Sequence, residues 1–516
     1  MSEQYAIECR GITKRFGSKV LANDSVNLQL KYGEILSLLG ENGSGKTTLM
    51  NMLSGIYRPD AGEIFVGGRE VFINSPVDSM RLGIGMIHQH FKLVEVFSAM
   101  DNIAIGTKGK RIAPAKLRAR IREISERFGL EVDPDKKVYD MSVSEKQTVE
   151  ILKVLYRGSD ILILDEPTAV LTPQETTKLF AILRKMRDDG KAIIIITHKL
   201  NEVMEISDRV TVLRKGRSVA TVATAKTDEL RLTELMVGHS VDLSIRRPDT
   251  PKKLNVLKVE GLTVNGSDGT RALEEVSFSL KGGEILGVAG VAGSGQKELC
   301  EAITGLLSYE EGSIELEGIE LHGKTPFEIL NLGVSISFVP EDRLGMGLVS
   351  SMGITDNMLL RTYYKTPGFF IDRKPAKEMA DKLIDKLQIL TPGSETPVRL
   401  LSGGNVQKVL LGREIEAAPK VLITAYAVRG LDINSSYAIY DLLNEQKEKG
   451  VAVLNVGEDL DVLLGLCDRI MVLCHGKITG IVDAKTTTKE QLGLMMTGAL
   501  GKTKTGADAR GEAAHV

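Results

Sequence analysis

Residues Ile35 to Thr48 read ILSLLGENGSGKTT. A mostly apolar run of strand length leads into a glycine-rich loop that fits the pattern G-x4-G-K-[ST], and an apolar helical stretch follows it. Glycines in such a loop let backbone N–H groups close around phosphates, and the start of the helix adds a favourable dipole. A glycine-rich turn that matches by chance is the alternative, but the strand–loop–helix setting favours a phosphate-binding loop.

The side chains of this loop predict how a nucleotide would be held. Lys46 is expected to reach the β and γ phosphates, and the Thr47 hydroxyl is expected to bind Mg²⁺. ATP and Mg²⁺ are therefore the expected cofactors. The loop residues expected to bind the nucleotide are Gly40, Glu41, Asn42, Gly43, Ser44, Gly45, Lys46, Thr47 and Thr48.

Two further strands end in residues that suit hydrolysis. Residues 161–166 read ILILDE, an apolar strand that ends in Asp165 and Glu166. Asp165 is expected to hold the hydrated Mg²⁺, and Glu166 to polarise the attacking water. His198 follows the apolar strand 193–196 and is expected to contact the γ phosphate. Acids that merely cap a strand and a purely structural histidine are the alternatives, which the intact phosphate loop disfavours.

The chain carries its main pattern twice. VNLQLKYGEILSLLG at 26–40 aligns with VSFSLKGGEILGVAG at 276–290, and SDRVTVL at 207–213 aligns with CDRIMVL at 467–473. The offset of about 250 to 260 residues predicts two copies of one domain. We expect domain 1 over 1–240, a linker over 241–255, domain 2 over 256–500 and a disordered tail over 501–516.

Strands that alternate with helices indicate the class of fold. The order of apolar strands and helical patterns predicts an α/β fold with a sheet core in each copy. Helical patterns at 116–128 and 375–390 predict an inserted helical subdomain. The sequence thus predicts two tandem P-loop NTPase domains, each with a mixed sheet core and a helical subdomain.

Composition and charge exclude several classes of protein. In 516 residues there are 66 Lys plus Arg and 68 Asp plus Glu, so bulk charge does not favour coating of nucleic acid or an anionic membrane. Cys9, Cys300, Cys467 and Cys474 form no CxxC pair, which predicts buried thiols rather than a disulfide scaffold. Because no apolar run approaches ~18 residues and no signal peptide is evident, we expect a soluble cytoplasmic protein.

With these motifs in place, the chain resembles a tandem ATP-binding subunit of an ABC transporter, in the group that imports sugars and nucleosides. The resemblance covers nearly the whole chain except the tail. It implies that Gln89, in IHQHF, joins Mg²⁺ to the membrane-subunit contact, and that Phe16, in KRFG, stacks on adenine. A solvated loop amide and a core phenylalanine are the alternatives for these two residues.

The resemblance also implies partners and a location. Two permease subunits and an extracellular solute-binding protein are expected, and no nucleic acid. The permease would hold the chain peripherally at the cytoplasmic face of the cell membrane.

Copy two departs from the family pattern in an orderly way. The replacements are Gln296 for the lysine, Lys297 for the metal-binding hydroxyl, Ala425 and Tyr426 for the two carboxylates, Glu341 for the glutamine and Glu458 for the histidine. Residues 263–272 also offer no aromatic side chain for adenine. Loss of a general base alone costs ~10² to 10⁴ in rate, so this copy is expected not to hydrolyse ATP.

The signature loops show the opposite distribution. LSGGN at 401–405 is similar to the family's LSGGQ, whose N–H groups and serine face a γ phosphate, whereas copy one has MSVSE at 141–145. Because domains of this family pair head to tail, the resemblance implies that Ser402, Gly403 and Gly404 bind the nucleotide held by copy one. One hydrolytic site and one degenerate site are therefore expected.

Other functions fit the chain less well. A tandem ATPase that acts on ribosomes would usually have a long charged linker and two intact sites, and a DNA-repair ATPase would need a coiled coil, cysteine pairs or a basic face. A scaffold without turnover is disfavoured by the complete set of residues in copy one. HQHFKLV at 88–94 and AYAVRGLD at 425–432 resemble the nucleoside branch, so nucleosides are the favoured solute and a monosaccharide of the ribose or galactose type is the alternative.

Overall fold

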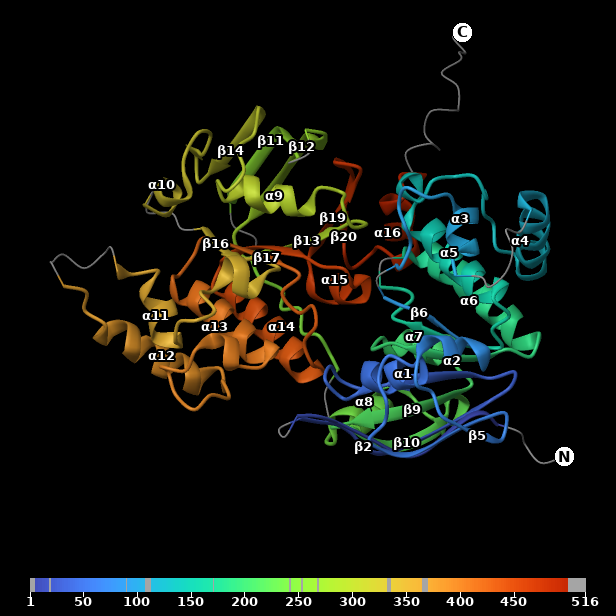
Figure 1. The fold of residues 1–516 in the computed structure, drawn as a ribbon. Coiled ribbons are helices and arrows are strands. Elements are labelled where there is room, and N and C mark those ends of the chain that lie inside the picture. The colour runs from blue at the N-terminus through green and yellow to red at the C-terminus, as the bar shows by residue number, and fades with distance from the viewer. Residues whose placement is uncertain are drawn as a thin grey trace, which may run out of the picture. The chain divides into compact units, whose positions relative to one another are not determined.

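The computed structural model describes residues 5–17, 20–89, 91–106, 113–169, 171–240, 243–251, 254–266, 269–331, 336–363 and 370–499. The chain forms two compact units, Met1–Leu243 and Ser244–Val516, and each contains two sheets with helices (Figure 1). The predicted tail and His90 lie outside the described residues.

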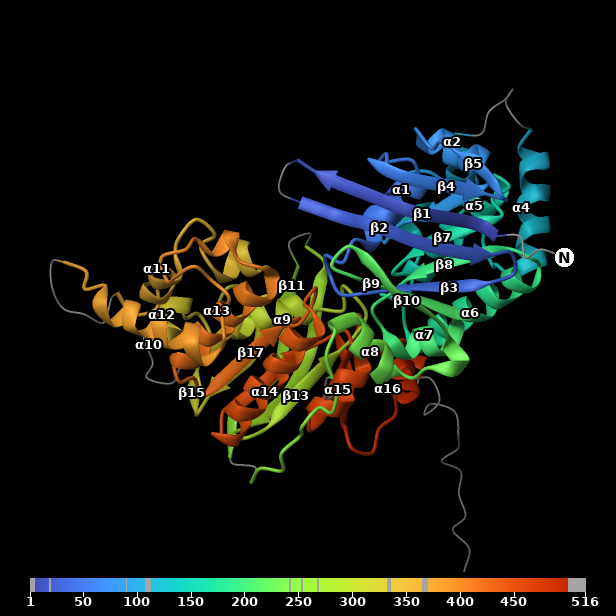
Figure 2. The ribbon, with the colours of Figure 1, turned by 90° about the horizontal axis from the view of Figure 1, so that it is seen from below.

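Unit 1 combines an antiparallel sheet with a larger, mostly parallel one. The antiparallel sheet has the order β2-β1-β4-β5, and Figure 2 shows β1, β2 and β4 side by side. The larger sheet has the order β10-β9-β3-β8-β7-β6, in which only β10 is antiparallel to its neighbour. The strands are β1 (Tyr5–Phe16), β2 (Val20–Lys31), β3 (Ile35–Leu39), β4 (Ala61–Val66), β5 (Arg69–Val71), β6 (Ile84–Ile87), β7 (Ile161–Asp165), β8 (Ala192–Ile196), β9 (Arg209–Arg214) and β10 (Arg217–Ala223).

Helices cover the larger sheet and form the predicted helical subdomain. The helices of unit 1 are α1 (Lys46–Leu53), α2 (Pro76–Arg81), α3 (Ala99–Ala104), α4 (Pro114–Phe128), α5 (Val143–Tyr156), α6 (Pro173–Asp188), α7 (Leu200–Ile206) and α8 (Glu229–Val237). The helix expected over 116–128 begins two residues earlier, because Pro114 suits the first turn, where no N–H is needed.

Side chains of the central strands alternate between two hydrophobic clusters. Ile35 and Leu162 join the cluster made with α3 to α6, whereas Leu36 and Ile161 join the one made with β1, β2 and α1. A parallel sheet covered on both faces favours apolar residues along the whole length of its strands. This preference explains the nearly continuous apolar runs that end at the phosphate loop and at Asp165, with Ser37 as the polar exception.

Unit 2 repeats this plan. Its sheets have the orders β12-β11-β14-β15 and β16-β17-β18-β13-β19-β20. The strands are β11 (Asn255–Asn265), β12 (Arg271–Lys281), β13 (Ile285–Ala289), β14 (Glu311–Leu316), β15 (Ile319–Glu320), β16 (Ile336–Val339), β17 (Val421–Ala425), β18 (Ala452–Val456), β19 (Arg469–Cys474) and β20 (Lys477–Asp483).

The helices of unit 2 also follow those of unit 1. They are α9 (Gln296–Ile303), α10 (Pro326–Asn331), α11 (Ile354–Leu359), α12 (Lys374–Lys386), α13 (Gly403–Glu416), α14 (Ile433–Glu448), α15 (Leu460–Leu466) and α16 (Lys489–Met496). The helix expected over 375–390 is shorter, because Gln388 adopts a left-handed φ of 50° that a continuing helix cannot accommodate.

Part of the segment between the repeats is docked on unit 2. The Arg247 guanidinium donates to the carbonyls of Leu464 and Cys467 at 2.9 and 3.0 Å. All four cysteines are buried and unpaired, as expected. Among the described residues, no helix is long and apolar enough to cross a membrane.

Candidate nucleotide-binding and hydrolysis site

The glycine-rich loop of unit 1 joins β3 to α1 in a shape that depends on glycine. Gly45 caps α1 with a φ of 97°, and a Cβ there would lie 2.4 Å from the Ala22 carbonyl oxygen. The Ser44 hydroxyl is buried in the loop and has no hydrogen-bond partner within the described part of the chain. A buried hydroxyl without a partner is costly, and a phosphate oxygen in the loop would satisfy it.

Lys46 lies at the centre of this loop. Its Nζ donates to the Gly40 and Glu41 carbonyl oxygens at 2.6 and 3.0 Å, and only 7% of the residue is exposed. Burial lowers the pKa of Lys46, although the nearby carboxylates of Glu166 and Asp165 oppose this change. The lysine thus holds the loop around its own ammonium group, and the negative charge of a phosphate would compensate this buried positive charge.

Two carboxylates meet at the end of β7. Burial and the adjacent charge of Glu166 raise the pKa of Asp165 to about 6, while Lys46 acts in the opposite direction. Such a pair of crowded carboxylates favours a bound cation, and the Thr47 hydroxyl is exposed at the start of α1. Asp165 and Thr47 therefore suit Mg²⁺.

Glu166 brings together the residues predicted for hydrolysis. Gln89 Nε2, after β6, donates to one carboxylate oxygen at 2.9 Å, and His198 Nδ1, after β8, lies 2.9 Å from the other. Burial raises the pKa of Glu166, but the hydrogen bond and charge of His198, with the charge of Lys46, outweigh it and leave the pKa below its ordinary value. The carboxylate is ionised at neutral pH, as a general base must be.

Phe16, expected to stack on adenine, lies in an exposed aromatic pair at the end of β1. Its ring meets the Tyr57 ring edge-on with centroids 5.2 Å apart, and Lys14 Nζ lies 5.8 Å from the Phe16 centroid. The residue is 39% exposed, so it is not a core phenylalanine. An exposed aromatic face of this kind can stack on a base.

The two signature loops differ in what occupies the start of the helix. In unit 1, the Glu145 carboxylate accepts a hydrogen bond from Ser142 N at 2.7 Å and pairs with Lys136 at 2.7 Å. In unit 2, the corresponding Asn405 donates from Nδ2 to Ser402 Oγ at 2.8 Å. The start of α5 thus already holds an anion of its own, whereas α13 has a neutral amide at the matching position.

Glycine is needed in the signature loop of unit 2 for packing. A Cβ on Gly404 would lie 2.4 Å from Ser435 Oγ, at the start of α14. Gly403 has room for a Cβ, with the Arg343 guanidinium 3.5 Å away. The predicted residues Ser402, Gly403 and Gly404 lie at the cap and in the first turn of α13.

The second phosphate loop keeps its backbone and loses its chemistry. Gly295 has a φ of 100°, and a Cβ there would lie 2.6 Å from the Ala272 carbonyl oxygen, much as at Gly45. Gln296 Nε2 donates to the Val291 carbonyl oxygen at 3.1 Å, at the position of one of the contacts that Lys46 makes. The amide reproduces a contact within the loop without supplying a charge for phosphate.

The glycine-rich loops, their strands and the signature segments match a known family. The family model described as ABC transporter matches residues 23–169 and 273–424, one stretch in each unit. The chain belongs to the ABC transporter family. As a member of this family, the chain is an ATPase.

Full-length relatives of this ABC protein are import ATP-binding proteins. The nucleoside import ATP-binding protein NupA of Lactococcus lactis subsp. cremoris is 44% identical, over 96% of this chain and 99% of its own. The guanosine import ATP-binding protein NupO of Bacillus subtilis is 45% identical, over 97% and 98%. The ribose import ATP-binding protein RbsA 1 of Rubrobacter xylanophilus is 40% identical, over 94% and 97%.

Solved ABC cassettes are also similar, each over less than half of this chain. The cbiO1 structure from Clostridium perfringens, part of the ABC transporter complex cbiONQ, has 28% identity and a TM-score of 0.40, over 46% of this chain and 97% of its own. The ADP conformation of the cassette MJ1267 has 22% identity and a TM-score of 0.42, over 46% and 99%.

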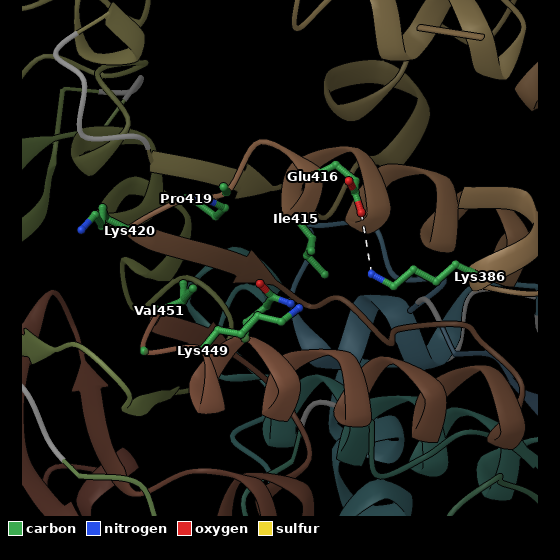
Figure 3. A pocket seen from close by; sticks show the side chains of 10 residues that line it. Lys386, Ile415, Glu416, Pro419, Lys420, Lys449 and Val451 are labelled. Carbon is green, nitrogen blue, oxygen red and sulfur yellow. Dashed lines mark ion pairs between the residues drawn. The ribbon is translucent and has the colours of Figure 1, made fainter. Parts of the chain in front are cut away.

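A pocket of about 430 Å³ in unit 2 is not the nucleotide site of the ABC fold. It lies where β17 and β18 begin, and Lys386, Lys420 and Lys449 line it with Glu416, which is 3.7 Å from Lys386 (Figure 3). The phosphate loop instead follows the end of β13, and β13, β17 and β18 are parallel. The pocket is therefore at the opposite edge of the sheet.

Three residues of this ABC protein have contacts that its sequence motifs do not predict. Tyr57 packs on Phe16, Glu145 caps the helix start in unit 1, and Arg429 pairs with Glu341 in unit 2. A signal for Arg429 was present, because its place in the repeat is held by Ala169 in copy one.

Proposed function

We propose that this ABC ATPase hydrolyses ATP at unit 1 to drive the import of nucleosides. The observation that carries the proposal of one hydrolytic site is the contact of Glu166 with both Gln89 and His198. Full-length similarity to a nucleoside and a guanosine import protein, at 44% and 45%, supports nucleosides as the solute. The 40% identity to a ribose import protein makes a monosaccharide the second candidate.

The candidate site residues of unit 1 each have a role in this proposal. The ionised Glu166 polarises the attacking water, while Gln89 and His198 fix the direction of its carboxylate. Lys46 exchanges its contacts with the Gly40 and Glu41 carbonyl oxygens for the β and γ phosphates. Phe16, with Tyr57 beside it, offers the surface for adenine.

Mg²⁺ belongs to the same proposal. Thr47, Asp165 and Gln89 would hold the ion. When bound, Mg²⁺ would neutralise developing charge on the phosphates. Burial and the nearby charge of Glu166 raise the pKa of Asp165 to about 6, which supports a cation beside it.

In our proposal, the signature loop of unit 2 completes the nucleotide site of unit 1. Ser402, Gly403 and Gly404 supply a hydroxyl and N–H groups at the start of α13, where no carboxylate occupies the position matching Glu145. The reverse combination would join a loop with Gln296 in place of the lysine to a helix start already capped by Glu145. Every defect thus falls in the second combination, which is expected to be inactive.

ATP-binding subunits of ABC importers work with transmembrane permease components. We infer two permease subunits for this chain, since it carries two ATPase units, and an extracellular solute-binding protein that delivers the nucleoside. The chain would then lie peripherally at the cytoplasmic face of the cell membrane, held by the permease.

The uptake of labelled solutes tests this proposal. Cells with the wild-type chain are compared with cells carrying Glu166→Gln, for nucleosides, pentoses and hexoses. Glu166→Gln keeps the shape and the partners of the side chain and removes the base, so nucleoside uptake is expected to fall at least 10²-fold. Loss of pentose or hexose uptake instead would replace the nucleoside assignment with the monosaccharide one.

The chain supplies a matched control in its second unit. Tyr426→Phe changes the position that corresponds to Glu166, and uptake is expected to remain near the wild-type level. If Tyr426→Phe stops uptake as completely as Glu166→Gln, the proposal of one hydrolytic site is wrong.

A further inference from the structure

The degenerate half-site of unit 2 repeats the arrangement found around Glu166 in unit 1, but with a cation at the centre and carboxylates around it. In unit 1, the anionic Glu166 is the centre, and Gln89 and His198 contact it from the loops after β6 and β8. In unit 2, the two outer positions are the carboxylates Glu341 and Glu458. The centre must therefore be a cation.

Arg429 is that cation. Its guanidinium forms an ion pair with Glu341, after β16, and lies 3.8 Å from Glu458, after β18. Arginine stays charged at any physiological pH, so it can serve both carboxylates permanently. Copy one has Ala169 at the matching position, where no side chain could make these contacts.

Tyr426 explains why the central residue of unit 2 is Arg429 and not the residue that matches Glu166. It takes the position of Glu166, and burial, with the charges of Glu341 and Glu458, raises its pKa to about 12. The phenol is neutral, so it neither binds a metal ion nor repels the two carboxylates. Glu341 and Glu458 would still repel each other without Arg429.

A second contact ties the same segments together in the opposite direction. The Arg343 guanidinium, in the loop after β16, donates to the Arg429 carbonyl oxygen, in the loop after β17. Each of these two loops thus contributes one arginine side chain to the contacts between them. Arg343 also lies beside Gly403 of the signature loop, and Arg343, Arg429 and Gly403 line one pocket of about 410 Å³. The paired loops therefore border the first turn of α13.

We propose that Arg429 is a positioning residue, a resident cation that fixes the loops after β16 and β18 and, through Arg343, the signature loop that acts on ATP in unit 1. The two loops of unit 2 stay joined with or without nucleotide, whereas in the described part of unit 1 Gln89 and His198 meet through the carboxylate of Glu166. This inference rests on the proposed function, because it assumes that the unit 2 signature serves the hydrolytic site.

Hydrogen–deuterium exchange of the full chain without nucleotide tests the paired loops. Arg429→Gln is expected to speed exchange about two- to fivefold in both segments, 340–348 and 456–460, as the loss of half-exposed ion pairs predicts. Glu458→Gln is expected to affect only the second segment. Arg373→Gln is the matched control, since Arg373 also bridges two carboxylates of unit 2, Asp356 and Glu395, at 2.6 and 3.1 Å.

Steady-state hydrolysis by the chain with its permease tests the positioning role. Arg429→Gln is expected to lower kcat several-fold with little change in KM for ATP, and Arg429→Lys is expected to recover part of kcat because it keeps the charge. The thermal midpoint of Arg429→Gln should match that of Arg373→Gln, which leaves kcat unchanged. This separates positioning from a loss of folding.

Two results would overturn the inference. Unchanged exchange in Arg429→Gln would show that the loops are not held by this residue. Faster exchange with an unchanged kcat would show that the loops do not position the signature. A failure of the proposed function is distinct, because it would appear in the wild-type chain, as hydrolysis that survives Glu166→Gln.

Discussion

Glu166 and Tyr426 share one backbone conformation at the same point of the two repeats, with left-handed φ values of 47° and 52°. In each, the backbone N–H donates to the last carbonyl of the neighbouring strand, Ile196 at 2.8 Å and Val456 at 2.9 Å. A non-glycine residue in this region costs about 1 kcal/mol or more, and the hydrogen bond holds it there. Because the copy without a carboxylate keeps the turn, the fold requires it, and in our proposal catalysis uses the direction that the turn gives to Glu166.

Restoring the carboxylate to unit 2 is therefore expected not to restore hydrolysis. Tyr426→Glu in the Glu166→Gln chain would place a carboxylate on the correct backbone, but Ala425 binds no metal and Gln296 carries no charge. ATPase activity is expected to stay below about 1% of the wild-type rate, consistent with the loss of a general base at unit 1. A phosphate-release assay on the double variant makes the measurement, and recovery above one-tenth of the wild-type rate would contradict the one-site account.

Lys46→Gln copies the loop of unit 2 into unit 1. The structure of unit 2 shows that glutamine fits, with Nε2 on the Val291 carbonyl oxygen, so the free energy of unfolding is expected to change by less than about 1 kcal/mol. Hydrolysis is expected to fall by about 10² or more, since the charge that faces the phosphates is gone. Denaturant unfolding and ATPase assays test the two halves, and a chain that unfolds instead would show that Lys46 is mainly structural.

The regular part of the site could be predicted because its signals are local. Strands β3 and β7 begin with their apolar runs, β7 extends one residue further to Asp165, and the glycine-rich loop lies between β3 and α1 as predicted. The predicted family and α/β fold are confirmed by the family match in both units. The helix expected over 375–390 ended early because a single left-handed residue, Gln388, interrupts an otherwise helical pattern.

The parts that were missed depend on contacts between distant residues. Arg429 meets Glu341 across 88 positions of the chain, and Tyr57 meets Phe16 although β2, β3 and α1 lie between them in the sequence. Hydrophobic period and motif spacing report which face of an element is buried, and they do not report which loops meet at the edge of a sheet. The roles of Gln89 and Phe16 came from the family resemblance, for the same reason.

Asp165 is expected to account for the additional stability that Mg²⁺ gives to unit 1 when ATP is bound. In the wild-type chain, ATP with Mg²⁺ should stabilise unit 1 more than ATP with a chelator, by about 1–3 kcal/mol if the ion raises affinity by one to two orders of magnitude. Asp165→Asn should make the two conditions equal, since a carboxylate beside Glu166 is replaced by a neutral amide. Thermal shift measurements supply the comparison, with Asp160→Asn, just before the start of β7, as the control that keeps the difference.

Glu145 gives a prediction for pH dependence that also tests which signature is used. Burial raises the pKa of Glu145, but the hydrogen bonds from Lys136 and Ser142 outweigh it and lower the pKa below the ordinary 4.5. The ionised carboxylate therefore contributes stability that is full above pH 4.5 and is lost as the pH falls through the lowered pKa. Glu145→Gln can keep the capping geometry, so its cost at pH 7 is expected to be only about 0.5 kcal/mol, because the pair with Lys136 is partly exposed.

Urea unfolding at several pH values measures this difference, which is expected to vanish only when the pH is below the lowered pKa of Glu145, where the wild-type side chain is also neutral. Glu131→Gln, at an exposed carboxylate of the same unit, is the comparison variant. ATPase activity of Glu145→Gln is expected to match the wild type, because the signature of unit 1 does not face the hydrolysed nucleotide in our account. A several-fold change in kcat would instead assign the start of α5 to the hydrolytic site.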